Sequence, residues 1–131
     1  MSEATLDASA LLAVLRQEPG ADLVAGLLRG GACAVSTVNL SEVVSKLLER
    51  GVDLVTIRGH LDGLGFVVHQ FDELDAFDAA SLRPLTRHAG LSLGDRACVV
   101  LAARLGTPVV TTDRSWTTAN LPVEVILARP A

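Results

Sequence analysis

Short apolar segments alternate with helix-like segments along almost the whole chain. Apolar runs occur at residues 32–36, 66–71, 108–111 and 124–127. The segments between them carry apolar residues at helical spacing, and several end at a glycine, such as Gly51, Gly65 and Gly106. Strands that alternate with helices predict a parallel sheet covered by helices on both faces. The expected fold class is therefore α/β, a three-layer α/β/α sandwich with a mostly parallel central sheet.

The same patterns give bounds for the individual elements. A further short strand is expected at residues 5–6, and Pro84 marks a break after the fifth helix. The predicted helices span residues 10–17, 22–29, 39–49, 53–64, 73–82 and 95–105, with Ser9 as the expected cap of the first. In sheets of this kind, functional residues gather at the carboxyl ends of the strands.

Length and composition place the chain in a broad class. Its 131 residues fit one domain, 1–131, and half of them are hydrophobic while only 3% are aromatic. The core is thus expected to consist of Leu, Val, Ile and Ala. No apolar run is long enough for a membrane span and the first residues do not resemble a signal peptide, so we expect a cytoplasmic protein with no membrane partner. Cys33 and Cys98 are expected to be buried thiols, because two distant cysteines form neither a disulfide framework nor a zinc site.

The net charge of −4 argues against a broad basic face that coats nucleic acid. It does not argue against an enzyme that binds RNA only around its active site, because cations bound to an acidic site offset part of the formal charge. Ten of the eleven basic residues are Arg and one is Lys. We interpret this imbalance mainly as a bias of composition, although Arg suits phosphate contacts.

Four of the fifteen acidic residues lie in apolar surroundings, namely Asp7, Glu42, Asp95 and Asp113. The others, Asp75 among them, occupy helix ends or polar stretches and are expected to be solvated. A carboxylate among apolar neighbours is costly unless its charge is compensated. Asp7 and Asp113 end predicted strands, whereas Glu42 and Asp95 lie in the predicted first turns of helices, so all four face the same rim of a parallel sheet. A structural alternative stays open for three of them: Asp7 as a helix cap, and Glu42 and Asp95 as complements to helix dipoles.

Converging carboxylates repel one another, and a cation is their natural partner. An all-oxygen site favours Mg²⁺ or Mn²⁺ over zinc. His60, His69 and His88 are scattered and form no pattern of metal ligands with the cysteines. A divalent ion held by carboxylates activates water and stabilises charge on a phosphodiester oxygen. The cluster therefore predicts a metal-dependent nuclease.

The four acids stand in segments that resemble the successive motifs of PIN-domain proteins, most closely the VapC-type toxins of bacterial toxin–antitoxin pairs. These segments are residues 6–12, 39–43, 93–97 and 111–116, and the resemblance covers essentially the whole chain. It implies a Mg²⁺- or Mn²⁺-dependent endoribonuclease, a cognate antitoxin protein that inhibits it, an RNA substrate and a homodimer. It also implies that Ser9 and Thr111 support the site with hydroxyl groups and that Asn39 supports it from behind. Trp116 and Thr117 follow the fourth motif where some relatives carry a further acid, so no fifth acid is assigned.

The expected roles of the acids follow from this resemblance and from metal chemistry. Asp7 and Asp95 are expected to hold the principal ion, Glu42 to orient a water or act as general base, and Asp113 to complete the metal shell or hold a second ion. Arg96 and Arg114 flank two of the acids and are expected either to contact phosphate or to form surface salt bridges. Trp116 is expected to be a core residue or, alternatively, a stacking platform for a base.

Three other classes of protein share part of the pattern. A phospho-acceptor receiver domain needs a Lys at a later strand end, but Lys46 lies inside a predicted helix. A phosphatase of the haloacid-dehalogenase type needs a second Asp two residues after Asp7, where this chain has Ser9. A catalytically silent PIN-like module that binds RNA or protein remains an open alternative, which only an activity measurement separates from a nuclease.

Overall fold

A computed structural model describes residues 2–129 and contains one five-stranded sheet with the order β3-β2-β1-β4-β5. The strands are β1 (Ala4–Leu6), β2 (Cys33–Ser36), β3 (Val67–His69), β4 (Val109–Thr111) and β5 (Val125–Leu127). Every pair of neighbouring strands is parallel. The α/β prediction is therefore confirmed. All five carboxyl ends lie on one rim of the sheet.

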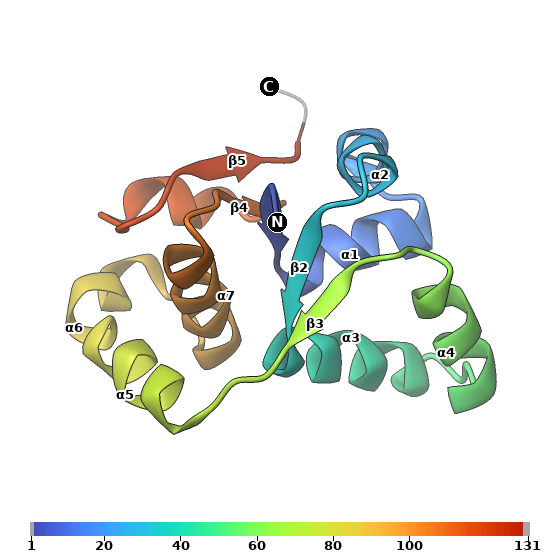
Figure 1. Cartoon of the computed structure of the whole chain (residues 1–131), viewed down its shortest axis with the longest axis horizontal. Coiled ribbons are helices and arrows are strands. Elements are labelled where there is room, and N and C mark those ends of the chain that lie inside the picture. Colours follow the sequence, from blue (N-terminus) through green and yellow to red (C-terminus); the bar gives the residue numbers. More distant parts are fainter. Residues whose placement is uncertain (1, 130–131) are drawn as a thin grey trace.

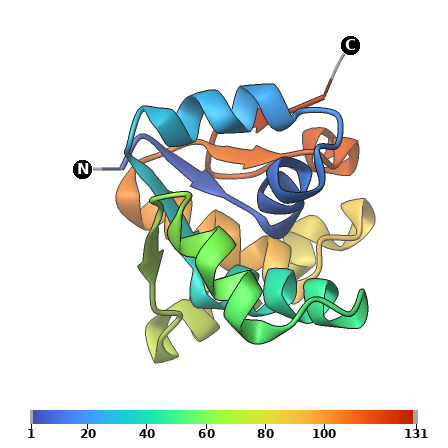
Figure 2. The ribbon, with the colours of Figure 1, turned by 90° about the vertical axis from the view of Figure 1, so that its right-hand side faces the viewer.

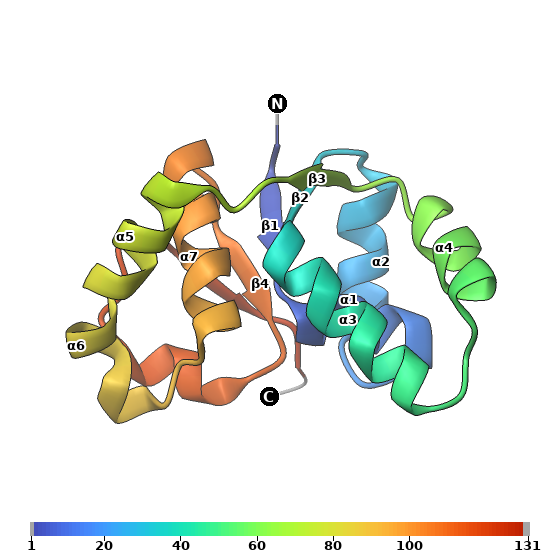
Figure 3. The ribbon, with the colours of Figure 1, turned by 90° about the horizontal axis from the view of Figure 1, so that it is seen from below.

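Helices cover both faces of this sheet (Figures 1 and 3). They are α1 (Ala8–Arg16), α2 (Ala21–Arg29), α3 (Thr37–Glu49), α4 (Leu54–Asp62), α5 (Glu73–Ser81), α6 (Arg83–Thr86) and α7 (Leu93–Leu105), with short 3₁₀ helices η1 (Arg87–Ala89) and η2 (Arg114–Thr118). Helices α5, α6 and α7 lie on one side, and α1, α2 and α4 on the other; Figure 2 shows the latter side face on. Helix α3 packs against both α1 and α7, so it crosses the rim at which the strands end.

The core is aliphatic, as the composition predicts. One cluster of buried side chains surrounds Leu6, Leu11, Val35 and Ile57, and a second lies beneath α7 around Val99. Trp116 belongs to the second cluster and is fully buried, so it is a core residue and not a platform for a base. Cys33 and Cys98 are free and buried, which confirms the prediction of two buried thiols.

Helices α1, α3 and α7 each begin two residues before the predicted start, and for α7 the cap is Ser92. The cause is clear for α1 and α3. Helix α1 begins at Ala8 and its cap is Asp7, not Ser9, because the Asp7 carboxylate accepts the backbone N–H of Ala10 at 2.8 Å. Helix α3 begins at Thr37, capped by Ser36, so Glu42 lies in its second turn instead of its first. In both cases a polar residue at the end of the preceding strand captures the free N–H groups and starts the helix early.

Two regions are exposed or buried against expectation. Strand β3 is an edge strand and leaves Val67 and Val68 about half exposed, although the apolar run at residues 66–71 suggested a buried strand. Asp75 was expected to be solvated, but it is buried and forms an ion pair with Arg104 at 2.8 Å that ties α5 to α7. Among residues 2–129 no helix is long and apolar enough to cross a bilayer.

Candidate active site

The four acids identified in the sequence lie around the rim where β1, β2 and β4 end. Asp7 follows β1 directly and Asp113 follows β4, whereas Glu42 lies on α3 and Asp95 in the first turn of α7. Their charges act on one another: Asp95 raises the pKa of Asp7, and Asp113 raises that of Asp95. The buried thiol of Cys98 senses Asp7, Asp95 and Glu42 together. The fold therefore brings Asp7, Glu42 and Asp95 near Cys98, and Asp113 lies near Asp95.

Asp7 is the most deeply buried of the four, with 3% of its surface exposed. Its Oδ1 accepts the Ser9 hydroxyl at 2.7 Å as well as the N–H of Ala10. Burial raises the pKa of Asp7 to about 6, although hydrogen bonds from Thr111, Ser9 and Ala10 act in the opposite direction. The carboxylate is thus held in place by donors while its charge remains poorly compensated.

Ser9 and Thr111 connect Asp7 to the loop after β4. The Ser9 hydroxyl lies 3.3 Å from the Thr111 hydroxyl and accepts the backbone N–H of Thr112 at 3.0 Å. The Thr111 hydroxyl in turn accepts the N–H of Asp113 at 3.1 Å. These two hydroxyls therefore fix the backbone that carries Asp113 relative to the start of α1.

Asp95 has a structural role at the start of α7. It forms a capping box with Ser92: the Ser92 N–H donates to Asp95 Oδ2 at 2.9 Å, and the Asp95 N–H donates to the Ser92 hydroxyl at 3.2 Å. Burial raises the pKa of Asp95, the Ser92 hydrogen bonds lower it, Asp113 raises it and Lys46 lowers it. A cap alone needs neither burial nor a neighbouring carboxylate, so the dipole interpretation explains only part of this position.

Glu42 is held against α7 by two residues from different segments. The Asn39 side-chain amide donates to Glu42 Oε1 at 3.0 Å and to the Gly94 carbonyl at 3.0 Å, and Asn39 itself is 1% exposed. A Cβ at residue 94 would overlap the Glu42 carboxylate. Sequence reasoning did not single out Gly94, although a glycine in the first turn of a helix is costly and signals a close approach.

The remaining predicted residues lie nearer the surface or inside the core. Asp113 is exposed and caps η2 through a hydrogen bond from the Ser115 N–H at 2.9 Å, and Arg114 beside it is also exposed. Arg96 is buried, and its guanidinium donates to the Ala79 carbonyl on α5 at 2.9 Å. Both alternatives expected for Arg96, a phosphate contact or a surface salt bridge, are therefore wrong, because its side chain is buried and anchors α5 to α7.

The donor set of the rim suits a hard divalent cation. The hydrogen bonds described above occupy one oxygen each of Glu42, Asp95 and Asp113, and the candidate ligands are oxygens throughout. Cys98 is a poor ligand, since burial raises its thiol pKa well above the ordinary value. Within residues 2–129 no three His, Cys, Asp or Glu side chains lie close enough to share one ion. The chemistry of the site fits Mg²⁺ or Mn²⁺, which one or two carboxylates hold together with waters and substrate phosphates.

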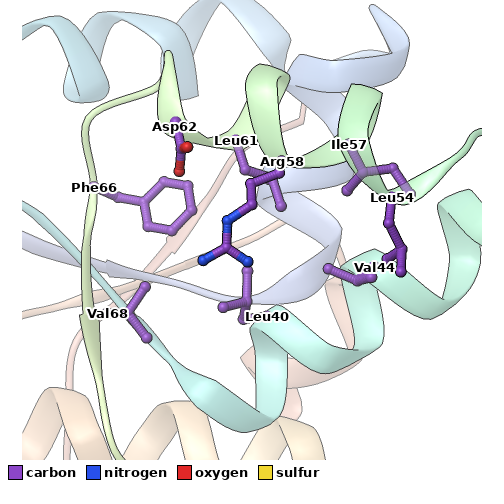
Figure 4. A pocket seen from close by; sticks show the side chains of 9 residues that line it. All are labelled: Leu40, Val44, Leu54, Ile57, Arg58, Leu61, Asp62, Phe66 and Val68. Carbon is purple, nitrogen blue, oxygen red and sulfur yellow. The ribbon is translucent and has the colours of Figure 1, made fainter.

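An apolar pocket of about 350 Å³ lies beside α3, on the side of the helix that faces α4 (Figure 4). It is formed between α3, α4 and β3, and its lining is apolar except for Arg58 and Asp62. The lining residues are Leu40, Val44, Leu54, Ile57, Arg58, Leu61, Asp62, Phe66 and Val68. None of the four rim acids lines this pocket, so it is a second, chemically distinct site.

Comparison with known proteins identifies the family to which the chain is similar. The family model described as the PIN domain matches residues 4–120, which is most of the chain. No curated protein sequence matches the chain.

Solved structures share the fold at low sequence identity. A toxin–antitoxin complex from Klebsiella pneumoniae contains a chain with a TM-score of 0.73 and 16% identity, over 98% of this chain and all of that one (100%). VapBC2 from Rickettsia felis, bound to a promoter DNA fragment, gives a TM-score of 0.71 and 14% identity, with coverage of 95% and 97%. DNA-bound VapBC from Salmonella typhimurium gives a TM-score of 0.68 and 17% identity, over 98% of this chain and 99% of that one. At these identities the similarity concerns the fold.

Proposed function

This chain belongs to the PIN domain family, and on that premise we propose that it is a divalent-metal-dependent endoribonuclease that acts as the toxin of a toxin–antitoxin pair. The observation that carries the proposal is the rim of four carboxylates, with Asp7 buried at a pKa raised to about 6. Nuclease activity is typical of PIN domains. The substrate in this proposal is RNA, either tRNA or rRNA.

Asp7 and Asp95 would hold a Mg²⁺ or Mn²⁺ ion, with Glu42 and Asp113 completing the site. When bound, the ion supplies an activated water and stabilises negative charge on the phosphodiester. Asn39 fixes Glu42 Oε1, which leaves the second oxygen of this carboxylate to orient the attacking water and accept its proton. Arg114, which is exposed beside Asp113, would contact the substrate backbone.

Cleavage of RNA by the purified chain tests the nuclease. We expect cleavage of total RNA or tRNA with Mg²⁺ or Mn²⁺, none with EDTA, and a loss of at least about 100-fold in Asp7→Asn and Asp95→Asn. Asp22→Asn, which changes an exposed acid in the first turn of α2, serves as the matched control. Thermal unfolding with and without Mn²⁺ gives a readout of binding that is independent of activity. Cleavage that survives EDTA and both rim substitutions would exclude this mechanism.

The proposed partner is a cognate antitoxin. The structural neighbours from Klebsiella pneumoniae and Salmonella typhimurium come from toxin–antitoxin and VapBC complexes. The apolar pocket beside α4 is a surface that an apolar protein segment would fill, because Leu54 and Val68 are exposed there. A homodimer is also part of the proposal, and sedimentation of the purified chain measures it.

Expression in cells tests the toxin role. Induction of the chain alone should arrest growth, and coexpression of a small neighbouring gene product should relieve the arrest. Asp95→Asn should be harmless at the same expression level. Harmless expression of a chain that cleaves RNA in vitro would instead assign it to another role within the PIN family.

A further inference from the structure

The single lysine of the chain lies beside the acidic rim. Ten of the eleven basic residues are Arg, so the composition strongly favours Arg, yet position 46 is Lys. Lys46 follows Glu42 by four residues on α3, which places the two side chains on the same border of the helix. Its exposed ammonium makes no hydrogen bond or ion pair with any residue between 2 and 129.

The packing of α3 determines where this cation points. Asn39, Val43 and Leu47 form the buried stripe of the helix. Leu40 and Val44 flank one side of that stripe and line the apolar pocket. Glu42 and Lys46 flank the other side, next to the first turn of α7, and the charge of Lys46 acts on Asp95 there. Lys46 is therefore an exposed cation at the edge of the carboxylate rim.

We propose that Lys46 binds a backbone phosphate of the RNA substrate next to the one that is cleaved, so that it positions the strand across the rim. One helical turn separates Lys46 from Glu42, about 6 Å along the axis, which is comparable to the spacing of consecutive phosphates. A flexible ammonium with three donors suits a phosphate that approaches from solvent. This inference rests on the proposed function, since it assigns a substrate contact to the same site.

A purely structural role for Lys46 is the alternative. The residue lies in the last turn of α3, where a cation complements the helix dipole. It also offsets some of the negative charge on the rim. The dipole effect would change the stability of the chain but not the salt dependence of RNA binding, and a general effect of charge would appear equally when another exposed cation is removed.

The experiment compares Lys46→Ala, Lys46→Arg and Arg29→Ala. Arg29 is the matched control because it is exposed, lies at the end of α2 and precedes β2, at the opposite end of the sheet. RNA cleavage with Mg²⁺ gives KM and kcat for each variant. Binding of a labelled mixed-sequence single-stranded RNA is measured over a range of KCl concentrations in a Glu42→Gln background, and thermal unfolding is measured for all variants.

For Lys46→Ala we expect KM to rise about tenfold with kcat changed less than about twofold, and the slope of log affinity against log salt to fall by about 0.7, the value for one phosphate contact on a single strand. Lys46→Arg should keep most of the affinity and the slope. Arg29→Ala removes the same charge and should leave both nearly unchanged.

Each contrary outcome has a defined meaning. Equal losses in Lys46→Ala and Arg29→Ala would reduce the effect to overall charge and overturn the contact. A lower melting temperature with an unchanged salt slope would assign Lys46 a structural role and overturn it as well. If RNA binds with a Lys46-dependent salt slope but is not cleaved by the unmodified chain, the result would support the phosphate contact and contradict the proposed nuclease activity. If the chain neither binds nor cleaves RNA, both the phosphate contact and the nuclease proposal would be contradicted.

Discussion

The two borders of helix α3, one facing the carboxylate rim and one facing the apolar pocket, differ from ordinary protein surfaces in opposite ways. On one border lies a polar rim in which a carboxylate, Asp7, is buried to 3% exposure. On the other lies an apolar pocket in which Leu54 is 60% and Val68 43% exposed. One border hides charge that water would solvate better, and the other exposes apolar surface that the core would bury.

Both departures cost stability in the isolated chain, and each cost indicates the type of ligand that would offset it. A cation compensates the buried carboxylate, and an apolar protein segment covers the pocket. Sites that break the general rules of folding are where function is expected. The buried stripe of α3 separates the two, so we expect substitutions on one border to leave the other border intact.

The largest expected effect concerns the ionisation of Asp7. Because burial raises its pKa to about 6 from 3.8, the folded chain holds this proton more tightly than the unfolded chain does. The stabilising contribution is present below the ordinary pKa and is lost as the pH rises through 6. In EDTA, Asp7→Asn should therefore raise the free energy of unfolding by about 3 kcal/mol at about pH 7.5, and by much less at about pH 4.

Urea unfolding of both proteins at the two pH values measures this difference. The Asn side chain keeps an oxygen for the N–H of Ala10, so the cap of α1 survives the substitution. Mg²⁺ should stabilise the unmodified chain more than the variant. A stability difference that is the same at both pH values would show that the burial of Asp7 does not oppose its charge.

The next effect concerns how Glu42 is seated against α7. Gly94→Ala places a Cβ where the Glu42 carboxylate lies, so the carboxylate must move. We expect RNA cleavage to fall by about 100-fold, because displacement of a catalytic group by about 1 Å has that order of effect. Gly59→Ala on α4 is the control, since no atom lies within 4 Å of its added Cβ. Equal activities of the two variants would show that Glu42 does not need this position.

Much of the fold could be predicted from the sequence because it depends on local signals. The alternation of apolar runs and glycine-terminated helices was sufficient for the α/β class and the parallel sheet. It was not sufficient for the exposure of β3, because an apolar run does not reveal whether a strand lies at the centre or the edge of a sheet. The ion pair of Asp75 with Arg104 joins residues 29 positions apart, and no local pattern predicts such a pair.

The site was partly predictable for the same reason. Apolar context separated Asp7 and Asp95 from most other acids, and a strand end for Asp7 and a helix start for Asp95 placed them on one rim. The role of Gly94 depends on the approach of α3 to α7, which only the packed structure defines. Arg96 was expected to contact phosphate or to form a surface salt bridge because it stands beside Asp95, but its side chain faces inward and its guanidinium donates to α5 instead.

A smaller effect is expected at Asn39, whose amide links Glu42 on α3 to the Gly94 carbonyl on α7. Asn39→Ala leaves the Gly94 carbonyl and Glu42 without their common donor. We expect about 1–3 kcal/mol of lost stability, the cost of unpaired buried polar groups, and about a tenfold loss of cleavage. Chemical unfolding and kinetics of one preparation measure both. Asn39→Asp replaces the donor by a second carboxylate and should lose more activity than Asn39→Ala; equal activity in all three would contradict the positioning role.

The smallest effect on the isolated chain is expected at the other border. Leu54 is the first residue of α4, directly after its cap Asp53, and an acid at a helix start is compatible with the dipole. Leu54→Asp should therefore change stability by less than about 0.5 kcal/mol and leave RNA cleavage unchanged, because α3 separates the pocket from the rim. Its affinity for the antitoxin identified by growth rescue should nevertheless fall at least about tenfold, as measured by calorimetry, since a charge enters an apolar contact. If Leu54→Asp instead impaired cleavage and spared antitoxin binding, the two borders of α3 would not be separate sites.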